Sequence, residues 1–71
     1  MWAMILESYE NKEWRIELRV EDNRYNVLLV PICAGMCMYG RIKKQKFYAL
    51  QKEKIAKATY RRWINKYCEN N

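Results

Sequence analysis

Residues 13–32, EWRIELRVEDNRYNVLLVPI, decide the fold of this chain. Across residues 13–20 charged and apolar side chains alternate without a break, and a period of two is the pattern of a half-buried β-strand. Residues 25–32 form a second apolar run rich in strand formers, and the four residues between the runs are polar turn formers. The stretch therefore predicts an antiparallel hairpin.

The register of this hairpin follows from its turn. Setting apolar side chains opposite one another pairs Val20 with Tyr25, Leu18 with Val27, Ile16 with Leu29 and Trp14 with Pro31. A shift of one residue would place Arg19 against those apolar positions, because strand side chains alternate between faces. Pro31 has no amide donor, so its end of the strand is expected at an edge, at a bulge or past the ladder.

The rest of the chain adds strands before the hairpin and a helix after it. Residues 2–9 are a further strand candidate, and residues 36–39 could form a short one. After Lys44 the chain has no Gly or Pro and many helix formers, which predicts one long helix over residues 47–67. We therefore expect a single α+β domain over residues 1–71, with a three- or four-stranded antiparallel sheet packed on one C-terminal helix.

Two opposite faces are expected on this helix. Side chains at helical spacing form an apolar, largely aromatic stripe: Ala49, Ala56, Tyr60, Trp63 and Tyr67. The side chains expected on the opposite face are Lys54, Ala58, Arg61, Arg62 and Asn65. We therefore expect Ala56, Tyr60, Trp63 and Tyr67 to meet Trp14, Ile16, Leu18, Val27 and Leu29 of the hairpin, leaving a basic face in solvent.

Charge is distributed unevenly along the chain. Residues 1–40 carry four basic and six acidic residues, a net charge of −2, whereas residues 41–71 carry ten basic and two acidic residues, a net charge of +8. Solvated faces normally mix signs, but Glu53 is the only acidic residue between Arg41 and Tyr67. A polyanion or an acidic protein surface is the natural partner of such a segment.

These patterns predict a non-enzymatic protein that binds nucleic acid through a basic helix. Lys and Arg at helical spacing can follow a phosphate backbone. The residues expected to contact phosphates are Arg41, Lys43, Lys44, Lys54, Lys57, Arg61, Arg62 and Lys66. Without any histidine the chain has no Ser-His or Cys-His pair, so catalysis is not expected.

An alternative is a protein-interaction module, such as an inhibitor or an adaptor. The same basic patch could bind an acidic protein, or a sheet edge could pair with a strand of a partner. In its size, the chain resembles the small accessory and antagonist proteins that mobile genetic elements produce. A homodimer is also expected, because a 71-residue chain buries only a small core and residues 25–32 are apolar on both faces.

Cysteine and methionine raise a third possibility. Cys33, Met36, Cys37 and Met38 gather soft sulfur ligands, and Cys68 could add another, but the chain has no Cys-x-x-Cys motif. We therefore expect no metal and no cofactor. Three cysteines do not make an even disulfide framework, and the apolar start of the chain is too short for a signal core, so a cytoplasmic location is expected.

Overall fold

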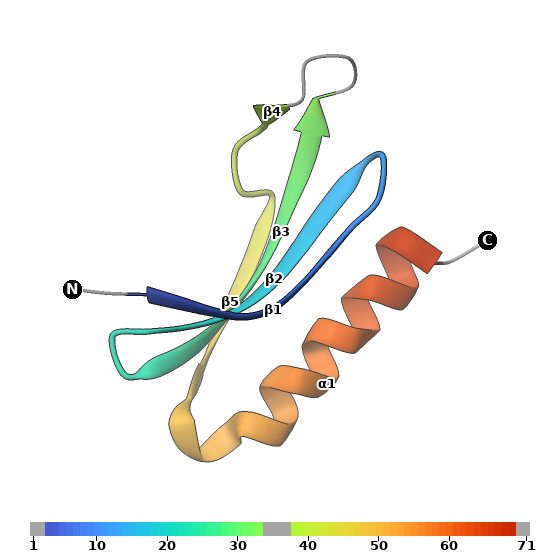
Figure 1. Ribbon diagram of the computed structural model, residues 1–71. Coiled ribbons are helices and arrows are strands. Elements are labelled where there is room, and N and C mark those ends of the chain that lie inside the picture. The colour runs from blue at the N-terminus through green and yellow to red at the C-terminus, as the bar shows by residue number, and fades with distance from the viewer. Residues whose placement is uncertain (1–2, 34–37, 70–71) are drawn as a thin grey trace.

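The computed structural model describes residues 3–33 and 38–69. Four strands form an antiparallel sheet in the order β1 (Ala3–Glu10), β2 (Trp14–Glu21), β3 (Arg24–Cys33) and β5 (Lys44–Ala49). The two-residue strand β4 (Met38–Tyr39) pairs with the end of β3. Helix α1 (Glu53–Trp63) packs on one face of the sheet (Figure 1). The predicted α+β fold is confirmed.

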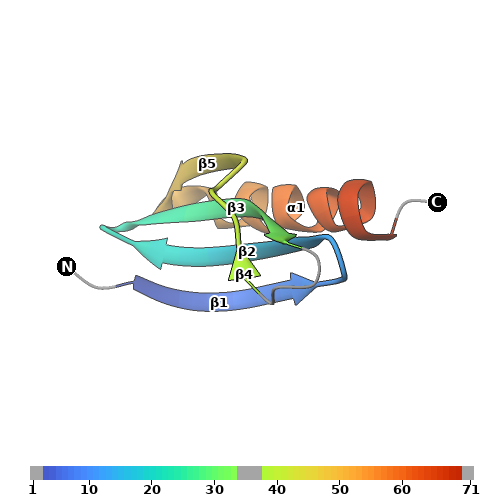
Figure 2. The same cartoon turned by 90° about the horizontal axis from the view of Figure 1, so that it is seen from above.

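Helix α1 is the only α-helix among the described residues, and a further helical turn adjoins it at each end. A 3-10 turn (Leu50–Lys52) precedes α1, and a π-helical turn (Ile64–Glu69) follows it. The strands and α1 form two layers (Figure 1), and seen from above α1 lies behind the strands (Figure 2). We call the sheet face away from α1 the open face.

The central hairpin has the predicted register. Val20 pairs with Tyr25, and the pairing runs without a shift to Trp14 opposite Pro31. Asp22 and Asn23 form the two-residue turn with φ angles of 53° and 60°. Two successive positive φ angles match the right-handed twist of the flanking strands, and Asp and Asn tolerate them better than most residues.

Pro31 lies where β3 changes partners. Strand β5 pairs with β3 as far as Leu29, and β4 begins pairing only at Ile32. The missing amide of Pro31 therefore falls past the β5 ladder, as predicted. The Pro31 carbonyl accepts a hydrogen bond from the amide of Gly40 at 2.8 Å. A Cβ on Gly40 would stand 3.0 Å from Pro31 Cγ, so this close approach favours glycine.

The predicted start of the helix at residue 47 is wrong. Phe47 and Ala49 belong to strand β5, and their cross-strand partners Asn26 and Arg24 lie on the open face. Ala49 is therefore exposed and is not part of the helical stripe. The physical reason is that β3 has a second edge to pair, and the six residues of β5 fill it. The proposed short strand at residues 36–39 is Met38–Tyr39, and residues 36–37 lie outside the described residues.

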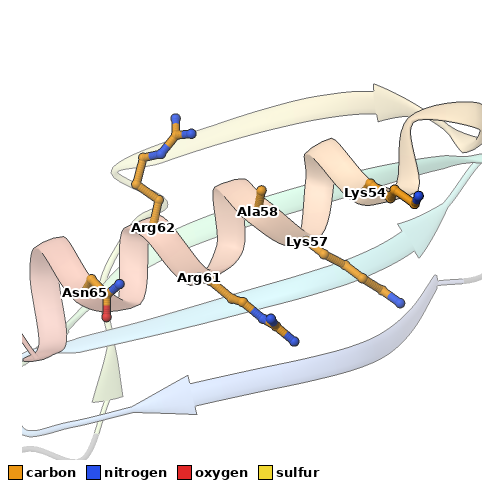
Figure 3. A pocket seen from close by; sticks show the side chains of 6 residues that line it. All are labelled: Lys54, Lys57, Ala58, Arg61, Arg62 and Asn65. Carbon is orange, nitrogen blue, oxygen red and sulfur yellow. The ribbon is translucent and has the colours of Figure 1, made fainter.

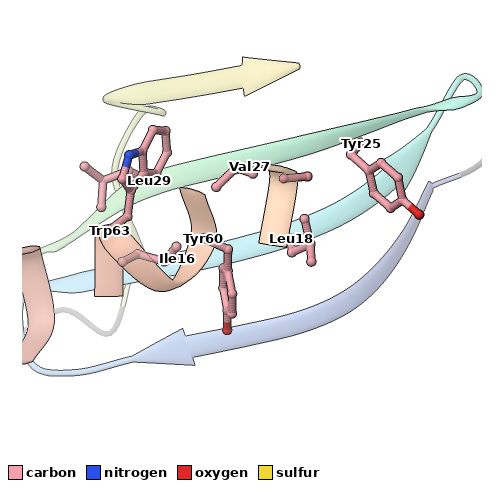
Figure 4. Close-up of a cluster of buried hydrophobic side chains, with 8 residues drawn as sticks. Ile16, Leu18, Tyr25, Val27, Leu29, Tyr60 and Trp63 are labelled. Atoms are coloured by element: carbon pink, nitrogen blue, oxygen red, sulfur yellow. The ribbon is translucent and has the colours of Figure 1, made fainter. Parts of the chain in front are cut away.

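The core lies between α1 and the two central strands (Figure 4). Trp63 and Tyr60 of α1 are almost fully buried against the sheet, and Trp14 and Tyr67 pack at the margin of the same cluster. The buried members are Ile16, Leu18, Tyr25, Val27, Leu29, Ala56, Tyr60 and Trp63. The predicted contact of the hairpin with Ala56, Tyr60, Trp63 and Tyr67 is confirmed.

Two polar contacts help to orient the helix on the sheet. The hydroxyls of Tyr48 in β5 and Thr59 in α1 are hydrogen bonded at 2.9 Å. At the other end, the side-chain amide of Asn11 donates to the carbonyl of Cys68 at 3.4 Å. The same Asn11 closes the turn between β1 and β2, because its side-chain oxygen accepts from the amides of Glu13 and Trp14 at 2.8 Å.

Candidate nucleic-acid interface

The solvent side of α1 forms a basic surface, which we call the basic helix face. Its side chains line one shallow, open depression (Figure 3): Lys54, Lys57, Ala58, Arg61, Arg62 and Asn65. Ala58 carries only a methyl group and lies among these longer side chains. Such a depression, ringed by positive charge, can seat an anionic group.

Helical geometry produces this separation of faces. Ala56, Thr59, Tyr60 and Trp63 are the buried residues of α1, and they recur at intervals of three and four. Lys54, Arg61 and Arg62 lie outside this buried stripe and are exposed. The burial of Trp63 and Tyr60 therefore holds the cations in solvent on a rigid element, which reduces the entropy lost when they bind a ligand.

One cation of the basic helix face is already paired. Lys57 Nζ lies 2.7 Å from a carboxylate oxygen of Glu53, one helical turn earlier. The hydrogen bond and charge of Glu53 raise the pKa of Lys57, and those of Lys57 lower the pKa of Glu53. Among the described residues, Lys54, Arg61 and Arg62 make no ion pair with a carboxylate. These three cations are therefore available to an external anion.

Three other lysines that were predicted to contact phosphates lie beside aromatic rings and not on the basic helix face. Lys43 Nζ lies 5.5 Å from the centre of the Trp14 ring, and Lys44 Nζ lies 5.2 Å from that of Trp63. Lys66 Nζ is 5.5 Å from the Tyr67 ring, within the range of a cation–π contact. The structure thus brings together Lys54, Lys57, Arg61 and Arg62, and separates from them Lys43, Lys44 and Lys66.

Arg41 is exposed in the connection between β4 and β5. It does not line the depression on α1. Asn65 does line it, and its side-chain amide adds a group that can donate and accept hydrogen bonds. The sequence placed Asn65 on this side of the helix, but its position beside Arg61 and Arg62 in one depression depends on the three-dimensional arrangement.

The open face of the sheet has a different electrostatic character. Glu17 is 6% exposed, and its two carboxylate oxygens accept hydrogen bonds of 2.6 Å from Arg15 and Arg19. Arg15 also bonds Glu10 at 2.9 Å, and Glu10 accepts a further bond of 2.8 Å from the hydroxyl of Tyr39. Because these charges neutralise one another, the open face is a poor site for phosphate.

Burial and pairing act in opposite directions on the pKa of Glu17. Burial raises it, but the hydrogen bonds and positive charges of Arg15 and Arg19 outweigh burial and hold the pKa below 4.5. In Tyr60, where burial dominates and the charge of Glu7 adds to it, the pKa is raised to about 12. Tyr60 is therefore a neutral phenol at physiological pH.

Acid should destabilise the fold through Glu17. Its lowered pKa means that the ionised carboxylate stabilises the fold above the unfolded value of 4.5, and that this contribution is lost as the pH falls from there through the folded-state pKa. Urea unfolding between about pH 6 and about pH 3 should show a steeper loss of stability in the wild type than in Glu17→Gln. At neutral pH the variant should be less stable by about 1–3 kcal/mol. Parallel pH profiles for the two proteins would contradict this role.

The predicted absence of a metal concerns residues that the structure describes only in part. Cys37 and Met36 lie outside the described residues, and Cys33 and Met38 are placed as paired strand positions of β3 and β4. Cys68 is half-buried at the edge of the core. Among the described side chains, no three Cys, Asp or Glu residues gather in a way that could hold a metal ion.

No helix within the described ranges is long and apolar enough to cross a membrane. Comparisons of the chain with models of known protein families, with curated proteins and with solved structures found no match. The function is therefore argued from the residues of the chain itself.

Proposed function

We propose that this chain is a small, non-enzymatic binding protein that contacts nucleic-acid phosphates through the basic helix face. The observation that supports the proposal is the gathering of Lys54, Arg61 and Arg62 around Ala58, with no carboxylate partner among the described residues. Of the four cations on the basic helix face, only Lys57 forms an ion pair with a described carboxylate, that of Glu53. This ion pair is exposed and therefore weak enough for a phosphate to compete with it.

A phosphate backbone suits this surface better than a single small anion does. The cations extend from Lys54 to Arg62 along α1, a separation of about 12 Å at 1.5 Å per residue. A duplex presents one phosphate about every 1.7 Å of its axis, so several phosphates come within reach of one helix face. The planar guanidinium groups of Arg61 and Arg62 can each bind two phosphate oxygens.

The alternative proposal is a protein-interaction module that binds an acidic partner surface or pairs by a sheet edge. The observation that favours it is that every residue of β1, at the edge of the sheet, is exposed. Both proposals suit a reducing compartment such as the cytoplasm, because the cysteine count is odd. They differ in whether nucleic acid alone, with no other protein present, binds the basic helix face.

Salt dependence tests the nucleic-acid proposal. Binding of a short fluorescent DNA duplex, followed by anisotropy over a series of salt concentrations, should give a log–log slope of about −2.7 if three phosphates are neutralised and about −3.6 if Lys57 leaves Glu53 to bind a fourth. A slope near zero, or no measurable binding at low salt, would rule out phosphate contact and leave the interaction module as the better account.

A further inference from the structure

Strand β1 is well formed, yet all eight of its residues are exposed. Among the described residues β1 pairs only with β2, and α1 packs on β2, β3 and β5. Met4, Ile5 and Leu6 are large apolar side chains, and Met4 and Ile5 are 50% and 49% exposed. Strand β1 thus has apolar side chains on both faces and a backbone edge to which no described strand is paired.

Edge strands are usually protected from pairing with a strand of another chain by lysine, proline or an inward-pointing charge. The sequence of β1, AMILESYE, has no lysine, arginine or proline. Its two charges are compensated within the chain, because Glu10 bonds Arg15 and Tyr39, and Glu7 acts favourably on the charge of Lys57. The opposite edge, β5, carries Lys44 and Lys46 and is protected in the usual way.

The bulge in β1 restricts the register in which two such strands can pair. Cross-strand partners share a face. Met4, opposite Val20, and Tyr9, opposite Ile16, therefore lie on the helix side, whereas Ile5 and Ser8 lie on the open face. The register shifts between Ile5 and Glu7, and Leu6 is the extra residue of the bulge. Before the bulge the odd-numbered residues lie on the open face, and after it the even-numbered residues do.

We propose that β1 pairs with β1 of a second copy, antiparallel about a two-fold axis, to give one continuous sheet. The register in which every pair shares a face sets Ala3 opposite Glu10, Met4 opposite Tyr9 and Ile5 opposite Ser8, and the reciprocal pairs follow by symmetry. This register uses the whole of β1 and buries Met4 and Ile5, which are exposed in the single chain. The interface is self-complementary, as a two-fold interface must be.

A second copy is a better occupant of this edge than an unrelated strand because pairing closes after two chains. Pairing of β1 with β5 of another copy would leave a free β1 at one end, so that further copies would add without limit. The lysines of β5 protect the outer edges of the dimer. The two exposed β1 edges, by contrast, pair with each other and are both covered.

This arrangement places both α1 helices on the same side of the sheet. Lys57 and Arg61 extend towards the β1 side of the helix, whereas Arg62 extends towards β5 (Figure 3). Arg61 also lines a second depression, together with Tyr9 and Ile64. In the dimer, Lys57 and Arg61 of the two copies would face each other across the paired β1 strands. The dimer forms without nucleic acid, so its test does not depend on the proposed function.

Sedimentation equilibrium of the protein alone tests the interface. At about 100 µM, where a dimer with a Kd of about 1 µM is almost fully formed, we expect a mass of twice 8.8 kDa. The variant Met4→Lys/Ile5→Lys should return 8.8 kDa under the same conditions with an unchanged far-UV spectrum, because both side chains are exposed in the single chain. Phe47→Lys, an exposed apolar residue on the other edge strand, is the matched control and should remain dimeric.

A monomeric wild type, or a dimer that survives Met4→Lys/Ile5→Lys, would overturn the proposal. So would growth beyond two copies, which indicates pairing of β1 with β5. Disulfide trapping provides a second measurement in a chain whose three cysteines are changed to serine. Mild oxidation of Ile5→Cys/Ser8→Cys should give a covalent dimer, because directly paired residues lie within disulfide distance. Met4→Cys/Ser8→Cys, on opposite faces, should not, and equal yields from the two variants would contradict the register.

Discussion

Trp63→Ala should leave the chain largely unfolded. Trp63 is 4% exposed and packs with Leu29 and Ile16 in the only cluster of buried apolar side chains that the described residues form. Truncating a buried tryptophan costs about 3–5 kcal/mol, which is close to the whole stability of a domain with so small a core. Circular dichroism during urea or thermal unfolding would measure the effect.

Ile55→Ala on the same helix is the matched control. Ile55 is exposed, so its truncation should change the free energy of unfolding by no more than about 0.5 kcal/mol. A Trp63→Ala protein that melts like the wild type would show that α1 does not dock on the sheet by the face described above. The basic helix face would then lose its structural basis, because the burial of Trp63 is what directs Arg61 and Arg62 to solvent.

The hairpin was predictable because its residues leave few alternatives. Alternation over residues 13–20 defines one apolar face, and only one register sets that face against Val27 and Leu29. The polar residues between the strands predicted the turn, although the strands extend to Glu21 and Arg24 and leave only Asp22 and Asn23 in it.

Strand β5 was not predictable in the same way. Its sequence, KQKFYA, contains lysine, glutamine and alanine, which are as compatible with a helix as with a strand. Tyr48 packs beside the core cluster, and the other five residues of β5 are exposed. The strand forms because β3 has an unpaired edge, which is a tertiary requirement that local sequence preference does not report.

The candidate site shows the same division. Helical periodicity was enough to separate Lys54, Arg61 and Arg62 from the buried stripe. It could not show that Lys43 and Lys44 stand beside Trp14 and Trp63, because those contacts join segments far apart in the chain. Similarly, alternation placed Glu17 among the outward side chains, but its burial between Arg15 and Arg19 becomes visible only in the folded sheet.

Arg61→Glu/Arg62→Glu should weaken nucleic-acid binding strongly while leaving the fold intact. Both side chains are exposed, and among the described residues neither has an ion-pair partner to lose. Two phosphate contacts would be replaced by repulsion, so affinity should fall by on the order of ten- to a hundredfold, to a similar extent for all sequences. A matched control is Lys12→Glu/Arg24→Glu, which makes the same change in net charge at exposed positions away from α1.

The most direct measurement is an anisotropy titration of one labelled duplex with the wild type, Arg61→Glu/Arg62→Glu and Lys12→Glu/Arg24→Glu at a single salt concentration of about 0.1 M. Phosphate contact by the basic helix face predicts a loss of at least about tenfold for the first variant and of less than about threefold for the control. Equal losses in both variants would contradict this account, because they would show that net charge, and not the surface on α1, determines binding.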